Sequence, residues 1–138
     1  MKRIIGVGSP FGADRLGWLA IDHLEKCLLP DCELVRLDRP GPGLLEYFKG
    51  AEQVVLIDAV LSRAEAGEAV TVSVDELADC GCLTSSHGFG VAEAVVLAGQ
   101  LGALPSRLHL IGIHAGSDPS SPPRLNTTLL ERRIQDLL

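Results

Sequence analysis

Three residues far apart in the chain carry side chains that could together hold a metal ion. Asp14 lies in a glycine-punctuated loop, Asp58 lies near the end of an apolar run, and His87 lies in the segment SSHGFG. Two carboxylates and one imidazole form an O,O,N ligand set for a divalent metal with open coordination positions. An open site can polarise a carbonyl and lower the pKa of bound water, as a hydrolase requires. Taken singly, each residue also has an ordinary interpretation as a cap, a strand end or a loop histidine.

A serine nucleophile is the rival chemistry for the same region. Ser85 and Ser86 are adjacent to His87, and Asp58 could complete a Ser–His–Asp set. The chain has no G-x-S-x-G elbow, and a serine so close in sequence to its own base is rarely aimed at it. The residues therefore favour the metal interpretation.

The glycine loop at the start of the chain is a weak candidate for phosphate binding. Gly6 and Gly8 follow an apolar run, but position 11 is Phe, the next glycine is Gly12, and no Walker lysine follows. A tight turn in which the backbone passes close to its neighbour explains these glycines. That turn is compatible with a role for Asp14.

The four cysteines predict free thiols in a reduced setting. They are Cys27, Cys32, Cys80 and Cys82. The pair in CGC at 80–82 could bind a soft metal, but no second pair completes a tetrahedral set, so two ordinary thiols in a turn are favoured. The first residues resemble no secretory signal, and no apolar run is long enough for a membrane span. We therefore expect a cytoplasmic protein without disulfides.

Composition bounds the chain to one folded domain over residues 1–138. Its 138 residues are 46% hydrophobic and 22% charged, which fits a single compact domain with a real core. The net charge of −6 argues against nucleic acid or an anionic membrane as a partner.

Apolar runs and helical spacings alternate along the chain and predict an α/β fold. Expected strands cover 2–7, 33–38, 53–60, 68–74 and 107–115, with the fourth at a sheet edge. Three helices are expected from apolar residues at helical spacing. Their apolar stripes are Trp18, Ile21, Leu24 and Leu28; Val91, Val95, Ala98 and Leu101; and Leu130, Ile134, Leu137 and Leu138. Pro30 ends the first helix, Asn126 can cap the last one, and a further short helix is expected in 41–50. The pattern predicts a three-layer α/β/α sandwich with a twisted, mainly parallel five-stranded sheet.

This architecture predicts where the chemistry lies. Ligands of open α/β sheets sit beyond the carboxyl ends of the strands, where the three candidate ligands are expected to meet. Arg15 and Arg39 flank this edge and could hold a substrate carboxylate or a peptide carbonyl. Asp38 and His114 end strands near it, and an ordinary structural role is favoured for both.

The order of motifs resembles the maturation endopeptidases of nickel–iron hydrogenases over nearly the whole length. The resemblance rests on GVGSPFGADRLG, LDRPGPGLL, the strand VVLIDAV ending in Asp-Ala, SSHGFGVAEAV before a helix, and the late strand LHLIGIHAGS. It implies an endopeptidase that removes a short C-terminal extension from a hydrogenase large-subunit precursor. It also implies that the metal is nickel already inserted in the precursor, so that the purified protease can be metal-free.

The resemblance also implies three metal ligands. The aspartate of Asp-Ala corresponds to Asp58 and the histidine before the helix to His87. The acid of the first loop corresponds to Asp14 or, by another count, to the position of Arg15; Asp14 is preferred because a guanidinium cannot ligate a cation. Ser9 departs from the family pattern, which has asparagine there.

Two other functional classes remain open from the sequence. One is a non-catalytic checkpoint or chaperone module that senses loaded metal through the same residues. The other is a small phosphate- or nucleotide-binding α/β module that uses the glycine loop.

Overall fold

A computed structural model describes residues 1–8, 15–27, 29–38, 42–60, 67, 69–72, 91–114 and 124–138. No helix in these ranges is long and apolar enough to cross a membrane. The elements follow in the order β1 (Lys2–Gly8), α1 (Leu16–Glu25), β2 (Cys32–Asp38), the 3-10 helix η2 (Pro42–Phe48), β3 (Gln53–Val60), β4 (Ala69–Val72), α3 (Val91–Gln100), β5 (Arg107–His114) and α4 (Thr127–Leu137).

The strands form one five-stranded sheet in the order β2-β1-β3-β5-β4. The pairs β1–β2, β1–β3 and β3–β5 are parallel, whereas β4 pairs antiparallel with β5 at the edge. The expected mainly parallel sheet, with its fourth strand at an edge, is therefore confirmed. The central strands are apolar because helices cover both of their faces.

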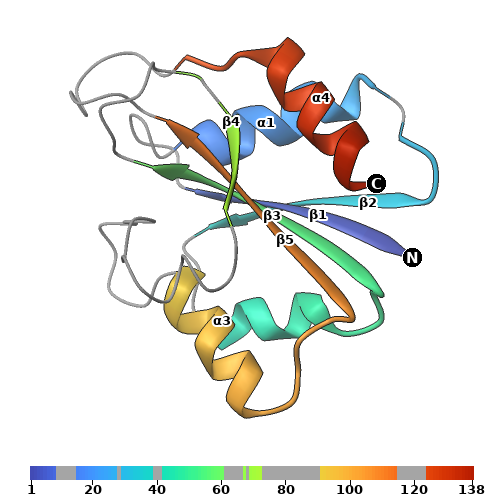
Figure 1. Ribbon diagram of the computed structural model, residues 1–138, viewed down its shortest axis with the longest axis vertical. Helices are drawn as coiled ribbons and strands as arrows, with labels where there is room; N and C mark the ends of the chain where they lie inside the picture. The colour runs from blue at the N-terminus through green and yellow to red at the C-terminus, as the bar shows by residue number, and fades with distance from the viewer. Residues whose placement is uncertain are drawn as a thin grey trace.

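Helices cover both faces of the sheet and complete the three expected layers (Figure 1). One core packs α1 and α4 against one face, around Leu24, Ile57 and Leu130. The other core packs η2 and α3 against the opposite face, around Leu44 and Leu56. The central strands β1 and β3 thus bury side chains in both directions, which is why their sequences contain nearly continuous apolar runs.

Local details correct two expectations about helices. The α-helix α1 ends at Glu25, before the expected position Leu28, which lies outside the described residues. Leu101 was expected on the buried stripe of α3 but is 65% exposed. The helix ends at Gln100, and the chain then turns through Gly102 with φ +66°, so Leu101 no longer follows the helical stripe.

The start of α4 follows its sequence pattern closely. Asn126 precedes the helix in an extended conformation, and its side chain accepts a hydrogen bond from the Leu129 N–H at 3.0 Å. This N-cap satisfies a donor that the first turn of a helix leaves unpaired. Leu130 and Ile134 of the expected stripe are buried against the sheet.

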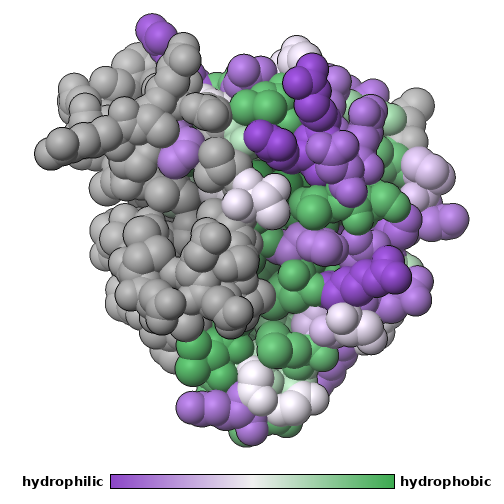
Figure 2. Space-filling model, in the orientation of Figure 1, coloured by the Kyte–Doolittle hydropathy of each residue, from purple (hydrophilic) through white to green (hydrophobic). Residues whose placement is uncertain are grey.

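The visible surface mixes polar and apolar side chains. Figure 2 shows hydrophilic side chains gathered over α4 and more hydrophobic ones toward α3. Large exposed apolar residues on and after α3 are Val96, Leu101 and Leu104. Scattered exposed apolar side chains of this kind are common on globular proteins.

Two glycines allow α1 to lie directly against the sheet. A Cβ atom on Gly6 of β1 would lie 2.3 Å from the carbonyl oxygen of Gly17. A Cβ atom on Gly17 of α1 would lie 2.1 Å from the carbonyl oxygen of Val7 and 2.9 Å from that of Ile57. Both contacts are with backbone, which cannot rotate away, so the first turn of α1 can hold this position only without side chains at both places.

We therefore expect Gly17→Ala to destabilise the fold strongly. The added methyl group forces α1 away from β1 and β3, at a cost of about 1–3 kcal/mol or more in free energy of unfolding. Gly43→Ala in η2 is the matched control, because its new Cβ meets nothing within 4 Å. Urea denaturation measures both, and equal stability of the two variants would contradict the close-packing argument.

Candidate functional site

The order of the strands reverses between β1 and β3, and this reversal defines where a ligand would bind. The chain passes from β1 outward to β2 and then returns to β3 on the other side of β1. In open α/β sheets, ligands bind at such a switch point, beyond the carboxyl ends of the strands. The switch point lies between the end of β1 at Gly8 and the end of β3, which carries Asp58.

Asp58 is the buried acid of this edge. Its side chain is 6% exposed, and among the described residues Gln53 and Asp58 are the buried polar or charged ones. The carboxylate Oδ1 accepts a hydrogen bond from the backbone N–H of Ala59 at 2.8 Å. A carboxylate buried in a central strand is costly to desolvate, and such groups concentrate at functional sites.

The other buried polar residue has a structural explanation. The Gln53 side chain donates a hydrogen bond to the backbone carbonyl of Leu137 at 2.6 Å. Gln53 begins β3, at the amino edge of the sheet, and so ties the end of α4 to the opposite edge from the switch point. Asp58 lies near the other end of the same strand, two residues before its last residue, Val60.

The first turn of α1 packs beside Asp58. The backbone of Gly17 lies against the carbonyl of Ile57, the residue before Asp58. The indole Nε1 of Trp18 donates to the backbone carbonyl of Leu37 in β2 at 3.2 Å. Contacts with β1, β2 and β3 therefore fix the start of α1 at the switch point.

Arg15 occupies the N-cap position of α1, and Asp14 is bonded directly to it. Arg15 is exposed and already has a helical backbone, with φ −74° and ψ −13°. Asp14 itself falls in the segment 9–14, outside the described residues. Gly8 and Arg15, the described residues that flank this segment, end β1 and cap α1, the elements that meet at the switch point.

Of the remaining expected site residues, some are described by the structure and others lie outside the described residues. Asp38 ends β2, and Gly8 pairs with it in register; His114 ends β5 and pairs with Val60. Both therefore lie at the expected edge, with Asp38 exposed and His114 partly exposed. Outside the described residues lie His87, Ser85, Ser86, Cys80, Cys82 and Arg39. The structure thus leaves untested whether Asp14 and His87 converge on Asp58.

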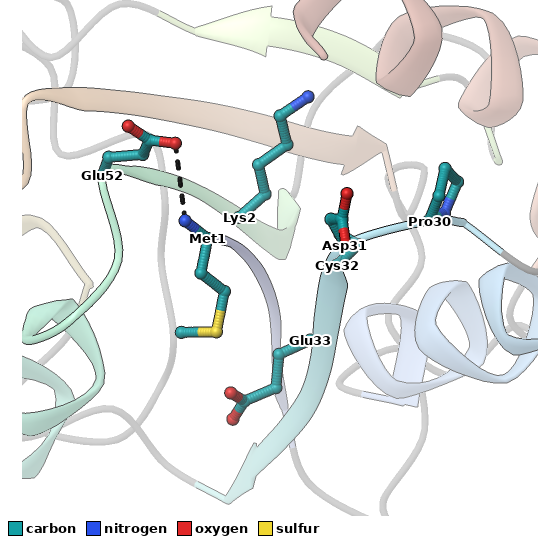
Figure 3. Close-up of a pocket in the computed structure, with 7 residues that line it drawn as sticks. All are labelled: Met1, Lys2, Pro30, Asp31, Cys32, Glu33 and Glu52. Carbon is teal, nitrogen blue, oxygen red and sulfur yellow. Dashed lines mark hydrogen bonds and ion pairs between the residues drawn. The ribbon is translucent and has the colours of Figure 1, made fainter.

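A pocket of about 740 Å³ lies at the other end of the sheet (Figure 3). It is lined by the chain start and the beginning of β2, including Met1, Asp31 and Cys32. Glu52 accepts a hydrogen bond from the amino group of Met1 at 3.4 Å across it. Because this pocket opens at the amino ends of the strands, it is not the place where this fold binds ligands.

One group of potential metal ligands lies away from the switch point. His23, Cys27 and Glu131 each offer a ligand atom within 4.8 Å of the others. Cys27 was expected to be an ordinary thiol, and His23 and Glu131 were not predicted as site residues. Part of the signal was present, since His23 and Cys27 are four residues apart, the spacing that brings side chains to one side of a helical turn. Glu131 could not be added without knowing how α1 and α4 pack.

A family model matches most of the chain. The match to the model described as HycI, hydrogenase maturation protease, covers residues 23–135. No curated protein sequence matches the chain.

Several solved structures of hydrogenase maturation endopeptidases are similar in fold to this chain. The [NiFe] hydrogenase maturation protease HybD from Thermococcus kodakarensis is similar with a TM-score of 0.72, 21% identity and coverage of 99% of both chains. The hydrogenase maturating endopeptidase HybD from Escherichia coli has a TM-score of 0.68 and 19% identity, with 99% of this chain and 89% of that chain covered. The endopeptidase HycI from Escherichia coli has a TM-score of 0.72 and 15% identity, with 99% and 88% covered.

Proposed function

We propose a nickel-recognition site at the switch point of this chain, which belongs to the hydrogenase maturation protease family. The chain is accordingly an endopeptidase, a hydrolase that processes the C-terminus of a hydrogenase large subunit. Its site is formed in this proposal by Asp14, Asp58 and His87. Residues 1–138 act as one domain, since one sheet contains all described strands.

The observation that carries the proposal is the buried carboxylate of Asp58. It lies at the carboxyl end of a central strand, beside the switch point, where this fold class binds ligands. The segment with Asp14 joins β1 to α1 at the same edge. The segment with His87 leads into α3, which runs back to the amino end of β5 and therefore begins on the carboxyl side of the sheet.

The substrate is proposed to be a nickel-loaded large-subunit precursor in the cytoplasm. Asp14, Asp58 and His87 hold the nickel ion of the precursor beside the scissile peptide. An ion held there would supply a Lewis acid beside the scissile carbonyl and the attacking water. A carboxylate that is not fully engaged by the ion serves as the general base. In this proposal, Arg15, which is exposed at the start of α1, holds a carboxylate or a peptide carbonyl of the precursor.

Asp58→Asn should abolish cleavage while preserving the fold. The amide oxygen can still accept the hydrogen bond from the Ala59 N–H, but the negative charge that holds a cation is lost. We expect processing of a nickel-loaded precursor to fall about a hundredfold or more. Asp136→Asn, an exposed acid near the end of α4, is the matched control. Full activity of Asp58→Asn, with thermal unfolding unchanged, would remove Asp58 from the site.

Asp14→Ala should abolish processing, whereas Arg15→Ala should only weaken it. A carboxylate can coordinate the cation and a guanidinium cannot, so the two neighbours differ in kind. The same cleavage assay compares both variants, with circular dichroism as the control for folding. An inactive Arg15→Ala together with an active Asp14→Ala would show that the ligand position in the first loop was wrongly assigned.

Cleavage should depend on nickel in the precursor rather than in the protease. Two oxygens and one nitrogen without a thiolate bind nickel weakly, so the purified protein should contain little or none of it. The precursor supplies the remaining ligands, and cleavage therefore follows correct loading. Elemental analysis and a processing assay with loaded and metal-free precursor measure this. Efficient cutting of metal-free precursor by chelator-treated protease would contradict it.

A further inference from the structure

Three side chains from two helices converge on the outer side of the molecule, away from the switch point. His23 Nε2 lies 2.7 Å from Glu131 Oε1, and Cys27 Sγ lies 3.5 Å from the same oxygen. Cys27 Sγ also lies 3.6 Å from the backbone oxygen of His23. More than a hundred residues separate Glu131 from the other two, so this cluster exists only in the folded chain.

The packing of α1 on α4 brings these residues together. His23 lies in the last turn of α1, and Cys27 lies in the turn that follows the helix, where its N–H donates to the carbonyl of Leu24 at 3.0 Å. Leu24 of α1 and Leu130 of α4 are buried in one core beneath the cluster. Glu131 follows Leu130 in α4, so the burial of Leu130 directs the neighbouring residue toward the seam between the helices. The packing of α1 on α4 therefore fixes the distances among the possible ligand atoms of His23, Cys27 and Glu131.

We propose that His23, Cys27 and Glu131 form a binding site for zinc. A thiolate, an imidazole and a carboxylate are the three ligand types that zinc prefers, and three protein ligands leave a fourth position for water. The side chains of His23 and Glu131 are 23% and 41% exposed, so an ion and a water molecule can reach the site. With an ionised thiol and carboxylate and a neutral imidazole, the ligands balance the two positive charges of the ion.

A metal ion that binds here must replace the proton of the Cys27 thiol. Burial, followed by the hydrogen bond to Glu131 and its negative charge, raises the pKa of the Cys27 thiol. Hydrogen bonds from His23 and Cys27 hold the pKa of Glu131 below its usual value. Zinc must displace the Cys27 proton: the S–H bond breaks, a Zn–S bond forms, and one proton is released to solvent. His23 then keeps its proton on Nδ1 and ligates through Nε2.

The zinc site is separate from the proposed nickel site. The backbone of Gly17 lies against the residue before Asp58, whereas Cys27 follows ten residues later in the chain. At a rise of about 1.5 Å per residue, the end of α1 at Glu25 is about 12 Å from that contact, and Cys27 follows two residues beyond it. A bound zinc ion therefore links α1 to α4 and stabilises the fold without contacting the reacting groups. Failure of one site leaves the other intact, so the two proposals can fail independently.

Cobalt and zinc binding test the proposal directly. The full chain carrying Cys80→Ser and Cys82→Ser is the parent, which removes the thiols of the CGC segment. Titration with Co²⁺ should produce one equivalent of a thiolate-to-cobalt absorption band, and Zn²⁺ should displace it. The thermal unfolding temperature of the parent should rise with Zn²⁺.

Matched variants assign the ligands. In the parent, Cys27→Ser should abolish the thiolate band, and Glu131→Gln should weaken Zn²⁺ binding at least about tenfold, since even the loss of a residue behind a ligand costs about 10–100-fold. Cys32→Ser, the other described free cysteine, should leave the band and the affinity unchanged. Asp58→Asn should also leave them unchanged, because it alters only the nickel site.

Three results would overturn the zinc proposal. Absence of the band in the folded parent, or its persistence in Cys27→Ser, would overturn the proposal. In that case the three side chains act only as a hydrogen-bonded link between the helices. Zinc affinity lost equally in Asp58→Asn would place the ion at the switch point and would overturn the proposal as well. Circular dichroism of each variant confirms that loss of binding is not loss of fold.

Discussion

The close approach of α1 to the sheet is the contact on which the rest of the molecule depends. Gly6 and Gly17 let a helix backbone touch the backbones of β1 and β3 at the switch point. Because α1 cannot slide along this contact, its start is fixed beside Asp58 and its end is fixed against α4. One steric constraint thus positions both the first loop and the cluster at the far end of the same helix. Side chains added at either glycine would disturb both together.

The topology of the sheet explains why the buried Asp58 lies at the expected ligand-binding edge. Asp58 lies on a strand that pairs with parallel partners on both sides, β1 and β5. Burying a carboxylate in such a strand is costly unless it is hydrogen-bonded, and Asp58 accepts a hydrogen bond from the Ala59 N–H at 2.8 Å. The reversal of strand order beside it opens that edge, because the connections from β1 and β3 leave in different directions. Fold and site are therefore consequences of one arrangement of strands.

Much of this fold follows from sequence because its signals are local. Continuous apolar runs predicted the central strands, interleaved polar residues predicted the edge strand β4, and Asn126 predicted the cap of α4. Leu101 was misassigned because periodicity alone does not reveal where a helix stops. Asp58 could be selected from sequence because it lies near the end of an apolar run, and it stays a predicted ligand. Glu131 could not be selected, because its partners depend on how two distant helices pack. The relation of Asp14 and His87 to Asp58 stays a prediction.

The two proposed donor sets suit opposite tasks. A protease that checks a loaded precursor must contact the ion without removing it, and an oxygen-rich site binds nickel too weakly to compete with cysteine ligands. A site that stabilises the fold must instead retain its ion, and a thiolate serves that purpose. In the two proposals, Cys27 follows the end of α1, about 12 Å along the helix from the contact beside Asp58, so the thiolate lies away from the nickel of the precursor. This separation would let one small domain bind zinc firmly while it only tests the nickel of its precursor.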